Sequence, residues 1–135
     1  MNNCIFCKIS NKEIDSHSIY EDEICMAILA INPVAEGHSL IILKIHYESF
    51  SDVEEEILKG MIITARYIGE KSKKVLQATG YNILNATGED AQQSVFHLHI
   101  HVVPRHKNDN LDLWFHGKEQ EKIRLIETLE KYKKY

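Results

Sequence analysis

The sequence predicts an α+β domain with a five-stranded antiparallel sheet, one long helix and a short C-terminal helix. Two observations carry this prediction. Short apolar runs rich in β-branched residues flank a single long segment whose apolar residues recur at the helical period. The resulting order of strands, long helix, strands and short helix is typical of an α+β fold. With 135 residues, 44% of them apolar, the chain can bury a core as one domain over residues 1–135.

The N-terminal half is expected to hold one turn and three strands. Its short apolar runs are bounded by charged residues or by loop signals such as Asn32-Pro33 and Glu36-Gly37. The expected elements, in order, are a turn or single helical turn at 4–9, a hairpin of 19–20 and 24–29 with its bend at 21–23, and a buried strand at 38–43.

The clearest helix is expected to begin at Ser51, because Ser51 and Glu54 have the spacing of a capping box. Gly80 lies where a C-terminal glycine would end this helix. The apolar positions between them are Val53, Ile57, Met61, Ala65, Ile68 and Val75.

The C-terminal half is expected to add two strands, at 81–85 and 96–103, with Pro104 ending the second. A loop at 87–90 separates them. Residues 118–134 are expected to form an amphipathic helix with one apolar side, made of Ile123, Ile126 and Leu129.

Composition excludes several classes of function. The net charge is −4 and both signs are interspersed, which argues against a nucleic-acid-binding protein. The sequence has no apolar run long enough for a transmembrane helix and no secretory signal at its start, so we expect no membrane partner and a cytoplasmic location.

Three alternating histidines are the most informative feature of the chain. On a strand, His97, His99 and His101 would share one face, while Leu98 and Ile100 would share the other. A single histidine there would be read as a polar group on an exposed edge. Three alternating histidines beside Gln92-Gln93-Ser94 favour a functional site over an exposed polar face, since imidazole serves at neutral pH as a nucleophile or as a metal ligand.

The pair Cys4-x-x-Cys7 is the second such feature. In a chain without a secretory signal, this spacing indicates metal binding or redox chemistry and not a disulfide framework. Redox chemistry needs a thioredoxin-like βαβ setting, for which the sequence gives no sign.

The pattern His-φ-His-φ-His-φ-φ, where φ is apolar, resembles the signature of the histidine-triad (HIT) family. The resemblance extends from about Cys4 to Trp114 and includes the segment Asn32-Pro-Val-Ala-Glu-Gly-His-Ser-Leu40. It is closest to the Hint-like bacterial branch. The resemblance implies a hydrolase or transferase that cleaves purine nucleotides at the α-phosphorus, with an AMP-like nucleotide as the small-molecule partner.

The resemblance also implies a role for individual residues. His99 would attack phosphorus and form a nucleotidyl-histidine intermediate, His101 would stabilise charge on the phosphate, and Ser94 would assist the leaving group. The substrate-binding residues would be Ile31, His38, Asn85, Gln92, Gln93, Ser94, His99 and His101.

Bacterial members that this sequence resembles often carry a structural zinc, which implies one zinc per chain here. Two thiolates and two imidazoles form a tetrahedral set that suits this ion. The ligands would be Cys4, Cys7, His46 and His97. The resemblance further implies a homodimer that joins two sheets into one, and Trp114 could lie in the pocket, in the dimer seam or in the core.

One departure from the family pattern concerns the nucleoside. Family members carry an aspartate for the ribose hydroxyls at the position of Ala30. Ala30 therefore leaves open a nucleotide-binding regulatory protein with weak or vestigial catalysis. The same histidines leave open a zinc module without catalysis.

Overall fold

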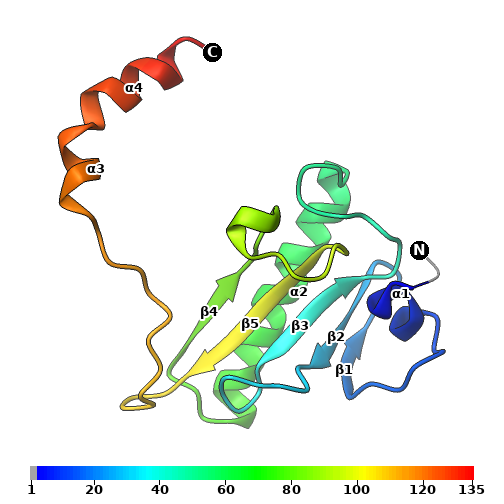
Figure 1. Ribbon diagram of the computed structural model, residues 1–135. Coiled ribbons are helices and arrows are strands. Elements are labelled where there is room, and N and C mark those ends of the chain that lie inside the picture. Colours follow the sequence, from blue (N-terminus) through cyan, green and yellow to red (C-terminus); the bar gives the residue numbers. More distant parts are fainter. Residues whose placement is uncertain (1–2) are drawn as a thin grey trace.

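A five-stranded antiparallel sheet organises the computed structural model, which describes residues 3–135 (Figure 1). The strand order is β1-β2-β3-β5-β4, so that β1 and β4 form the two edges. The strands are β1 (Ser18–Glu21), β2 (Cys25–Leu29), β3 (Ser39–Leu43), β4 (Gly80–Leu84) and β5 (His99–Arg105). The helices are α1 (Ile5–Ser10), α2 (Glu55–Val75), the 3-10 turn η1 (Glu89–Ala91), α3 (Glu119–Ile123) and α4 (Leu125–Lys133). The predicted fold class is confirmed.

The long helix α2 covers one face of the sheet and the short helix α1 covers part of the other (Figure 1). Alternation along the strands divides the core accordingly. The first cluster joins α2 to the sheet and includes Leu98, Ile100 and Val102, all fully buried. The second cluster, on the α1 side, includes Phe6 and Ile9. The triad histidines therefore lie on the α1 side.

Both predicted ends of α2 are wrong. The helix begins at Glu55, and the side chain of Glu54 makes no capping hydrogen bond. Ser51 lies in the preceding turn, where the Asp52 carboxylate accepts hydrogen bonds from the backbone amides of Glu48 and Ser49. At the other end the helix stops at Val75, and Gln77 takes the left-handed conformation with φ 56°. The turn is thus made three residues before Gly80, which begins β4 instead.

The triad strand also differs at both ends from its prediction. It begins at His99 and continues through Pro104 to Arg105. Pro104 is tolerated because the pairing of β5 with β3 ends at Val102, so the missing N–H of proline costs no hydrogen bond on that side. His97 precedes the strand, where the amide of Leu98 donates to the carbonyl of Tyr47 at 2.6 Å.

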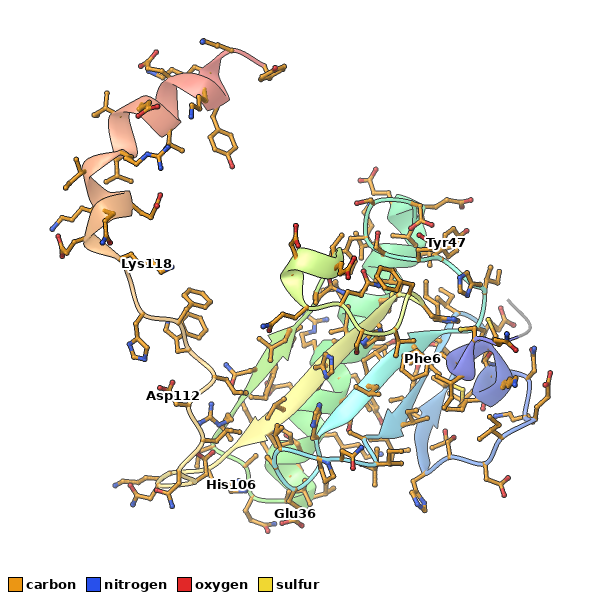
Figure 2. All side chains as sticks on the ribbon, in the orientation of Figure 1. Phe6, Glu36, Tyr47, His106, Asp112 and Lys118 are labelled. Atoms are coloured by element: carbon orange, nitrogen blue, oxygen red, sulfur yellow. The ribbon has the colours of Figure 1, made fainter. Side chains whose placement is uncertain are left out.

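The predicted C-terminal helix is two helices, α3 and α4, which are separated at Arg124. Every residue from Trp114 to Tyr135 is exposed, and this part of the chain extends away from the sheet (Figures 1 and 2). Within residues 3–135, none of the helices is long and apolar enough to cross a membrane.

Candidate active site and metal centre

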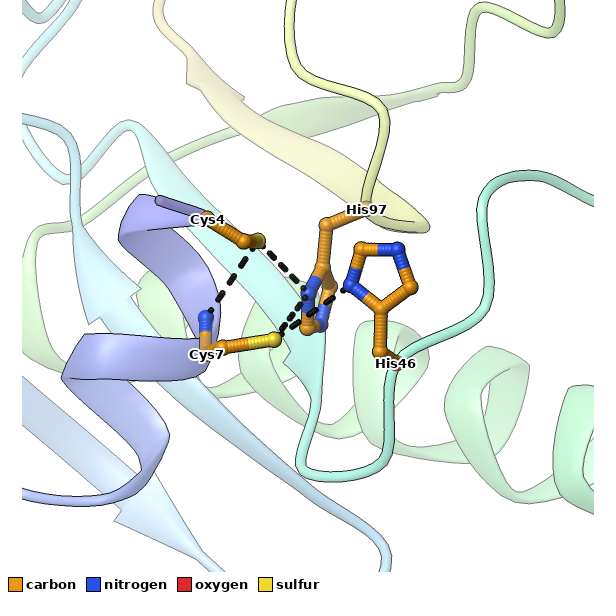
Figure 3. A group of neighbouring side chains, drawn as sticks. All are labelled: Cys4, Cys7, His46 and His97. Atoms are coloured by element: carbon orange, nitrogen blue, oxygen red, sulfur yellow. Dashed lines mark hydrogen bonds between the residues drawn. The ribbon is translucent and has the colours of Figure 1, made fainter. Parts of the chain in front are cut away.

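Two cysteines and two histidines converge where α1 meets the sheet (Figure 3). Cys4 precedes α1 and Cys7 lies within it, while His46 follows β3 and His97 precedes β5. Their ligand atoms all lie within 4.8 Å of one another. The four residues predicted as a metal site are thus brought together from three separate parts of the chain.

The imidazole of His97 is held in the tautomer that a metal ligand needs. Its Nε2 lies 2.7 Å from the carbonyl oxygen of Leu43, which can only accept, so the hydrogen is on Nε2. Its Nδ1 lone pair then faces the sulfurs of Cys4 at 3.3 Å and Cys7 at 3.5 Å. A metal-bound histidine commonly has its other ring nitrogen bound to such a carbonyl.

The distances also suit the size of zinc. The Sγ of Cys7 lies 3.3 Å from Nδ1 of His46. A tetrahedral zinc with bonds of about 2.3 Å to sulfur and about 2.0–2.1 Å to nitrogen sets its ligand atoms about 3.3–3.8 Å apart. Cys4 and Cys7 are free thiols, and the antiparallel sheet is not the βαβ setting of a redox pair. The residues present therefore fit zinc.

His99 presents an unprotonated nitrogen. Its Nδ1 lies 2.7 Å from the carbonyl oxygen of His97 and must donate to it, so the lone pair is on Nε2. Burial lowers the pKa of His99, which favours this neutral form, although the bond to His97 opposes the shift. Phe6 packs edge-on against the ring at 5.1 Å between centroids and restricts its orientation.

His101 is held in the opposite tautomer by a chain of hydrogen bonds. The amide of Val34 donates to Nδ1 of His38 at 3.2 Å, so a neutral His38 carries its hydrogen on Nε2. That atom lies 3.0 Å from Nδ1 of His101 and donates to it. His101 then carries its own hydrogen on Nε2. Neighbouring rings of one strand thus offer a lone pair on His99 and an N–H on His101, with centroids 5.2 Å apart.

All the rings in this row favour the neutral state. Burial is the main reason that the pKa of His101 falls from 6.5 to about 4, and the proximity of His99 and His38 adds to it. Burial also lowers the pKa of His38. An imidazole that stays neutral at pH 7 can keep the tautomer that its hydrogen bonds specify.

The loop before the triad is held by buried amide groups. Gln93 is 6% exposed, and its side chain donates to the carbonyls of Glu48 and Val95 and accepts from the amide of Gly88. Ser94, next in the chain, is exposed, and so is Gln92, which takes a left-handed conformation. The loop therefore presents Ser94 and Gln92 to solvent while Gln93 fixes its course.

Asn85 bonds to the triad strand itself. Its amide donates to the carbonyl oxygen of His99 at 2.9 Å, and its own oxygen accepts from the Thr87 hydroxyl at 2.8 Å. Asn85 thus contacts the site through a hydrogen bond to the backbone of His99 and not through its ring.

A family model decides how this site is classified. The model of the HIT domain matches residues 11–108, more than half of the chain. The chain belongs to the HIT family. An uncharacterized HIT-like protein of Borreliella burgdorferi is 42% identical over 111 residues, which cover 81% of this chain and 80% of that protein.

Two HIT relatives carry the names of enzymes. The adenylylsulfatase of Arabidopsis thaliana is 37% identical over 110 residues, 82% of this chain and 56% of that protein. The adenosine 5'-monophosphoramidase of Saccharomyces cerevisiae is 39% identical over 102 residues, 76% of this chain and 62% of that protein.

Solved HIT structures agree with the fold. A Zn-bound histidine triad protein from Mycobacterium smegmatis superposes with a TM-score of 0.80 at 37% identity, over 92% of this chain and 90% of that chain. A Streptococcus mutans protein superposes with a TM-score of 0.89 at 36% identity, over 99% of this chain and 85% of that chain.

The part of the site that the sequence predicted to face a nucleoside is the part least defined by contacts within the chain. Ile31 is 83% exposed in the loop between β2 and β3. The amide of Ala30 donates to the carbonyl of His38, and its methyl side chain offers no acceptor to a ribose. In contrast, His38 is 8% exposed and belongs to the row of histidines.

Three residues of the site were not predicted from the sequence. Phe6, which packs on His99, could have been found from its place between the two cysteines. The amide of Val34 and the carbonyl of Leu43 set the tautomers of His38 and His97, and backbone groups leave no signal in residue types.

Proposed function

We propose that the chain is a nucleotide hydrolase or transferase that cleaves the α-phosphorus of an AMP-like substrate through a nucleotidyl intermediate on His99. The observation that carries the proposal is the pair of opposite tautomers. A lone pair on Nε2 of His99 suits attack on phosphorus, and an N–H on Nε2 of His101 suits a non-bridging phosphate oxygen.

The reaction has two displacements. In the first, Nε2 of His99 forms a bond to phosphorus while the bond from phosphorus to the leaving group breaks, and the Ser94 hydroxyl passes a hydrogen bond or proton to that group. In the second, water attacks phosphorus while the bond to His99 breaks and its electron pair returns to Nε2. The proton that the water loses restores the Ser94 hydroxyl or passes to solvent, which balances the proton that the leaving group took in the first step. The products are a nucleoside monophosphate and the protonated leaving group.

The other predicted residues support this chemistry in different ways. Gln92 and Ser94 are exposed and can reach a bound phosphate, whereas the polar atoms of Gln93 are engaged within the loop. We assign Gln93 to positioning the loop and Asn85 to positioning the backbone of His99. Ile31 and His38 complete the predicted substrate-binding set.

The proposed substrates share an adenylyl group with a labile bond at phosphorus. The classes are phosphoramidates, acyl-adenylates and dinucleoside polyphosphates. Two relatives named as an adenosine 5'-monophosphoramidase and an adenylylsulfatase support an adenylyl substrate. Without an acceptor at Ala30, we expect the ribose to be bound more weakly, by about 1.5–3 kcal/mol for a lost hydrogen bond to a charged group.

Zinc is proposed as a structural ion held by Cys4, Cys7, His46 and His97. Bound there, it would supply a cross-link between α1 and the sheet, with all four of its positions taken by protein. The bond of His97 to Leu43 and that of His99 to the carbonyl of His97 would then hold the nucleophile in place.

We also propose a homodimer paired along β4. This strand is one of the two edges of the sheet, and an open edge offers unpaired N–H and C=O groups to a second chain. Location in the cytoplasm remains an expectation.

The test is turnover of an adenosine phosphoramidate by His99→Ala. We expect a loss of at least about 1,000-fold in kcat, because no other group in the site offers the same lone pair. The matched control is His17→Ala, a histidine that is exposed and distant from the triad in sequence. Zinc content and circular dichroism check the fold of both variants. Turnover by His99→Ala at the rate of the control would contradict the mechanism.

A second candidate function rests on Ala30. A regulatory protein that binds nucleotides with vestigial catalysis would still bind AMP measurably but turn over none of the proposed substrates. Calorimetry with AMP, beside the turnover assay on the unmodified protein, separates this function from the enzyme.

A further inference from the structure

An open cavity of about 480 Å³ lies between the C-terminal half of α2 and the sheet, on the face away from the triad histidines. Ile68, Ser72 and Val75 lie on one side of α2 at i, i+4 and i+7 and form its helical wall. Leu29 and Ser39 line it from the sheet. The volume is in the range of small-molecule sites, about 300–1,000 Å³.

The walls of the cavity are apolar and are not covered by the chain itself. Val75 is 59% exposed and Ile19, from β1, is 41% exposed, although both line the cavity. The strand β1 is the sheet edge opposite β4, so a dimer paired along β4 would leave this region open. Accessible apolar side chains that line a concave surface are typical of a binding site.

The neutral polar groups of the cavity can only accept hydrogen bonds from a ligand. The Ser39 hydroxyl donates to the carbonyl oxygen of Gly37 at 2.8 Å, and the Ser72 hydroxyl donates to that of Gly69 at 2.6 Å. Each hydroxyl hydrogen is therefore engaged within the chain. The two oxygens keep lone pairs for a ligand that brings its own donors.

The charge that the cavity offers is negative. The exposed Glu36 lines one end, and its side chain makes no hydrogen bond or ion pair within residues 3–135. Figure 2 shows Glu36 at the end of the molecule where α2 ends. Lys71 also lines the cavity, but its ammonium lies 5.6 Å from the centroid of the Tyr67 ring, and Tyr67 is not among the lining residues. The cation is thus held toward Tyr67, outside the cavity.

We propose that this cavity binds an amphipathic primary amine, with its apolar body between α2 and the sheet and its ammonium at the Glu36 carboxylate. An ammonium group has three donors and no acceptor, which matches the carboxylate and the two serine oxygens. An apolar carboxylate would instead meet Glu36 with like charge. The binding of the amine does not depend on the proposed hydrolase function.

The bound amine would act on the triad through His38. The side chains of His38 and Ser39 point to opposite faces, so that Ser39 lines the cavity while His38 bonds to His101. Gly37, on the other side of His38 in the chain, also lines the cavity and packs so closely on Leu76 that a Cβ would lie 2.4 Å from it. A ligand there contacts the residues on both sides of His38.

The first test is a titration of the full-length, nitrogen-labelled protein with 4-phenylbutylamine, followed by NMR. We expect saturable shifts of the amide signals of Ser39, Ser72 and Val75, and matching shifts of the ring nitrogens of His38 and His101. The matched anion, 4-phenylbutyrate, should bind at least about fivefold more weakly. Equal affinity of amine and acid, shifts that do not saturate, shifts centred on another surface, or unmoved ring nitrogens would each overturn the proposal.

The second test changes the charge of the cavity in full-length variants with matched controls. Glu36→Gln should raise the Kd of the amine about fivefold, whereas Glu23→Gln, in the turn between β1 and β2, should leave it within twofold. Equal Kd values in these two variants would contradict a role for Glu36.

A second pair of variants adds a cation at two equally exposed positions of α2. Val75→Lys places it on the cavity wall and should raise the Kd at least about fivefold. Ile63 is 57% exposed, close to the 59% of Val75, and does not line the cavity, so Ile63→Lys should leave the Kd within twofold. The same Kd in both lysine variants would show that the amine binds elsewhere.

Discussion

The Nε2 atom of His38 lies 3.0 Å from Nδ1 of His101 and donates its hydrogen to it. Because Val34 already occupies the other nitrogen of His38, this bond decides which nitrogen of His101 faces a ligand as an N–H group. A histidine outside the triad therefore sets the chemical form of one inside it.

Replacement of His38 should reduce catalysis without removing the nucleophile. His38→Phe leaves Nδ1 of His101 without its donor, and we expect kcat to fall about 10–100-fold, in the range of an interaction made in the transition state. His38→Gln retains an N–H donor and should recover part of the loss. Nitrogen NMR of labelled histidine should show that His101 carries its hydrogen on Nε2 in the unmodified protein and loses this preference in His38→Phe. The same tautomer in both proteins would contradict the claim that His38 sets the form of His101.

The stability of the protein should fall as the pH is lowered from about 6.5 to about 4. Unfolded His101 binds a proton below 6.5, whereas in the folded chain burial first, and the neighbouring His99 and His38 second, hold its pKa at about 4. The unfolded state thus binds more protons in this window, and stability is lost through it. At about 1.36 kcal/mol for each pKa unit, the contribution of His101 is at most about 3.4 kcal/mol, lost as the pH falls through this window.

The comparison that isolates this contribution is His101→Gln against the unmodified protein at each pH. Loss in acid of any zinc bound at the proposed Cys4/Cys7 site would affect both proteins alike and cancel in the difference. Denaturant titrations at pH 4, 5, 6 and 7 should give a shallower fall for His101→Gln. Parallel curves for the two proteins would exclude the predicted shift.

Removal of one thiolate should release the metal and loosen the site. Cys7→Ala is expected to reduce zinc from one per chain to near zero by elemental analysis and to lower Tm, because α1 and its Phe6 contact with His99 lose their cross-link. Cys25→Ala is the matched control, since Cys25 is buried away from the cluster beside Thr64. A full zinc complement in Cys7→Ala would show that the cluster does not hold this ion.

Gly37 tests how tightly the loop before His38 is packed, and Gly88, in the loop between β4 and β5, is its control. Gly37 and Gly88 both have positive φ, at 82° and 95°. A Cβ on Gly37 would lie 2.4 Å from Leu76 and 3.1 Å from Pro104, while a Cβ on Gly88 meets no atom within 4 Å. Gly88→Ala should cost about 1 kcal/mol from backbone strain, and Gly37→Ala should cost about 1–3 kcal/mol more. Equal unfolding free energies in chemical denaturation would rule out the crowding at Gly37.

The sequence predicted the parts of this molecule that depend on periodicity. The alternation of the three histidines with Leu98 and Ile100 placed the triad on one face of its strand, which is the face opposite α2. The four residues of the observed cluster followed from the Cys-x-x-Cys pair together with the family resemblance. Local signals failed where the tertiary structure offers another partner. Where Ser51 was expected to cap the long helix, the Asp52 carboxylate instead stabilises a turn before it. Where Pro104 was expected to end the strand, the pairing of β5 with β3 has already ended and the strand continues.

The backbone groups that set the histidine tautomers, and the course of the C-terminal segment 112–135, could not be predicted from the sequence for physical reasons. The tautomers depend on the amide of Val34 and the carbonyls of Leu43 and His97, groups that every residue type carries. The amphipathic pattern at 118–134 predicted a helix with one apolar side. It could not show that the chain breaks at Arg124 or that this side stays uncovered in a single chain.

The central claim is that Nε2 of His99 is the nucleophile. The most direct measurement is a denaturing quench at alkaline pH, where a bond from phosphorus to imidazole survives, of an adenosine phosphoramidate reaction within the first turnover, followed by peptide mass spectrometry under alkaline conditions to locate the adenylyl group. The account predicts one adenylyl group per site, on His99, formed and lost at rates that match turnover. An adenylyl group on His101 or on another residue, or turnover without any adenylated peptide, would contradict it.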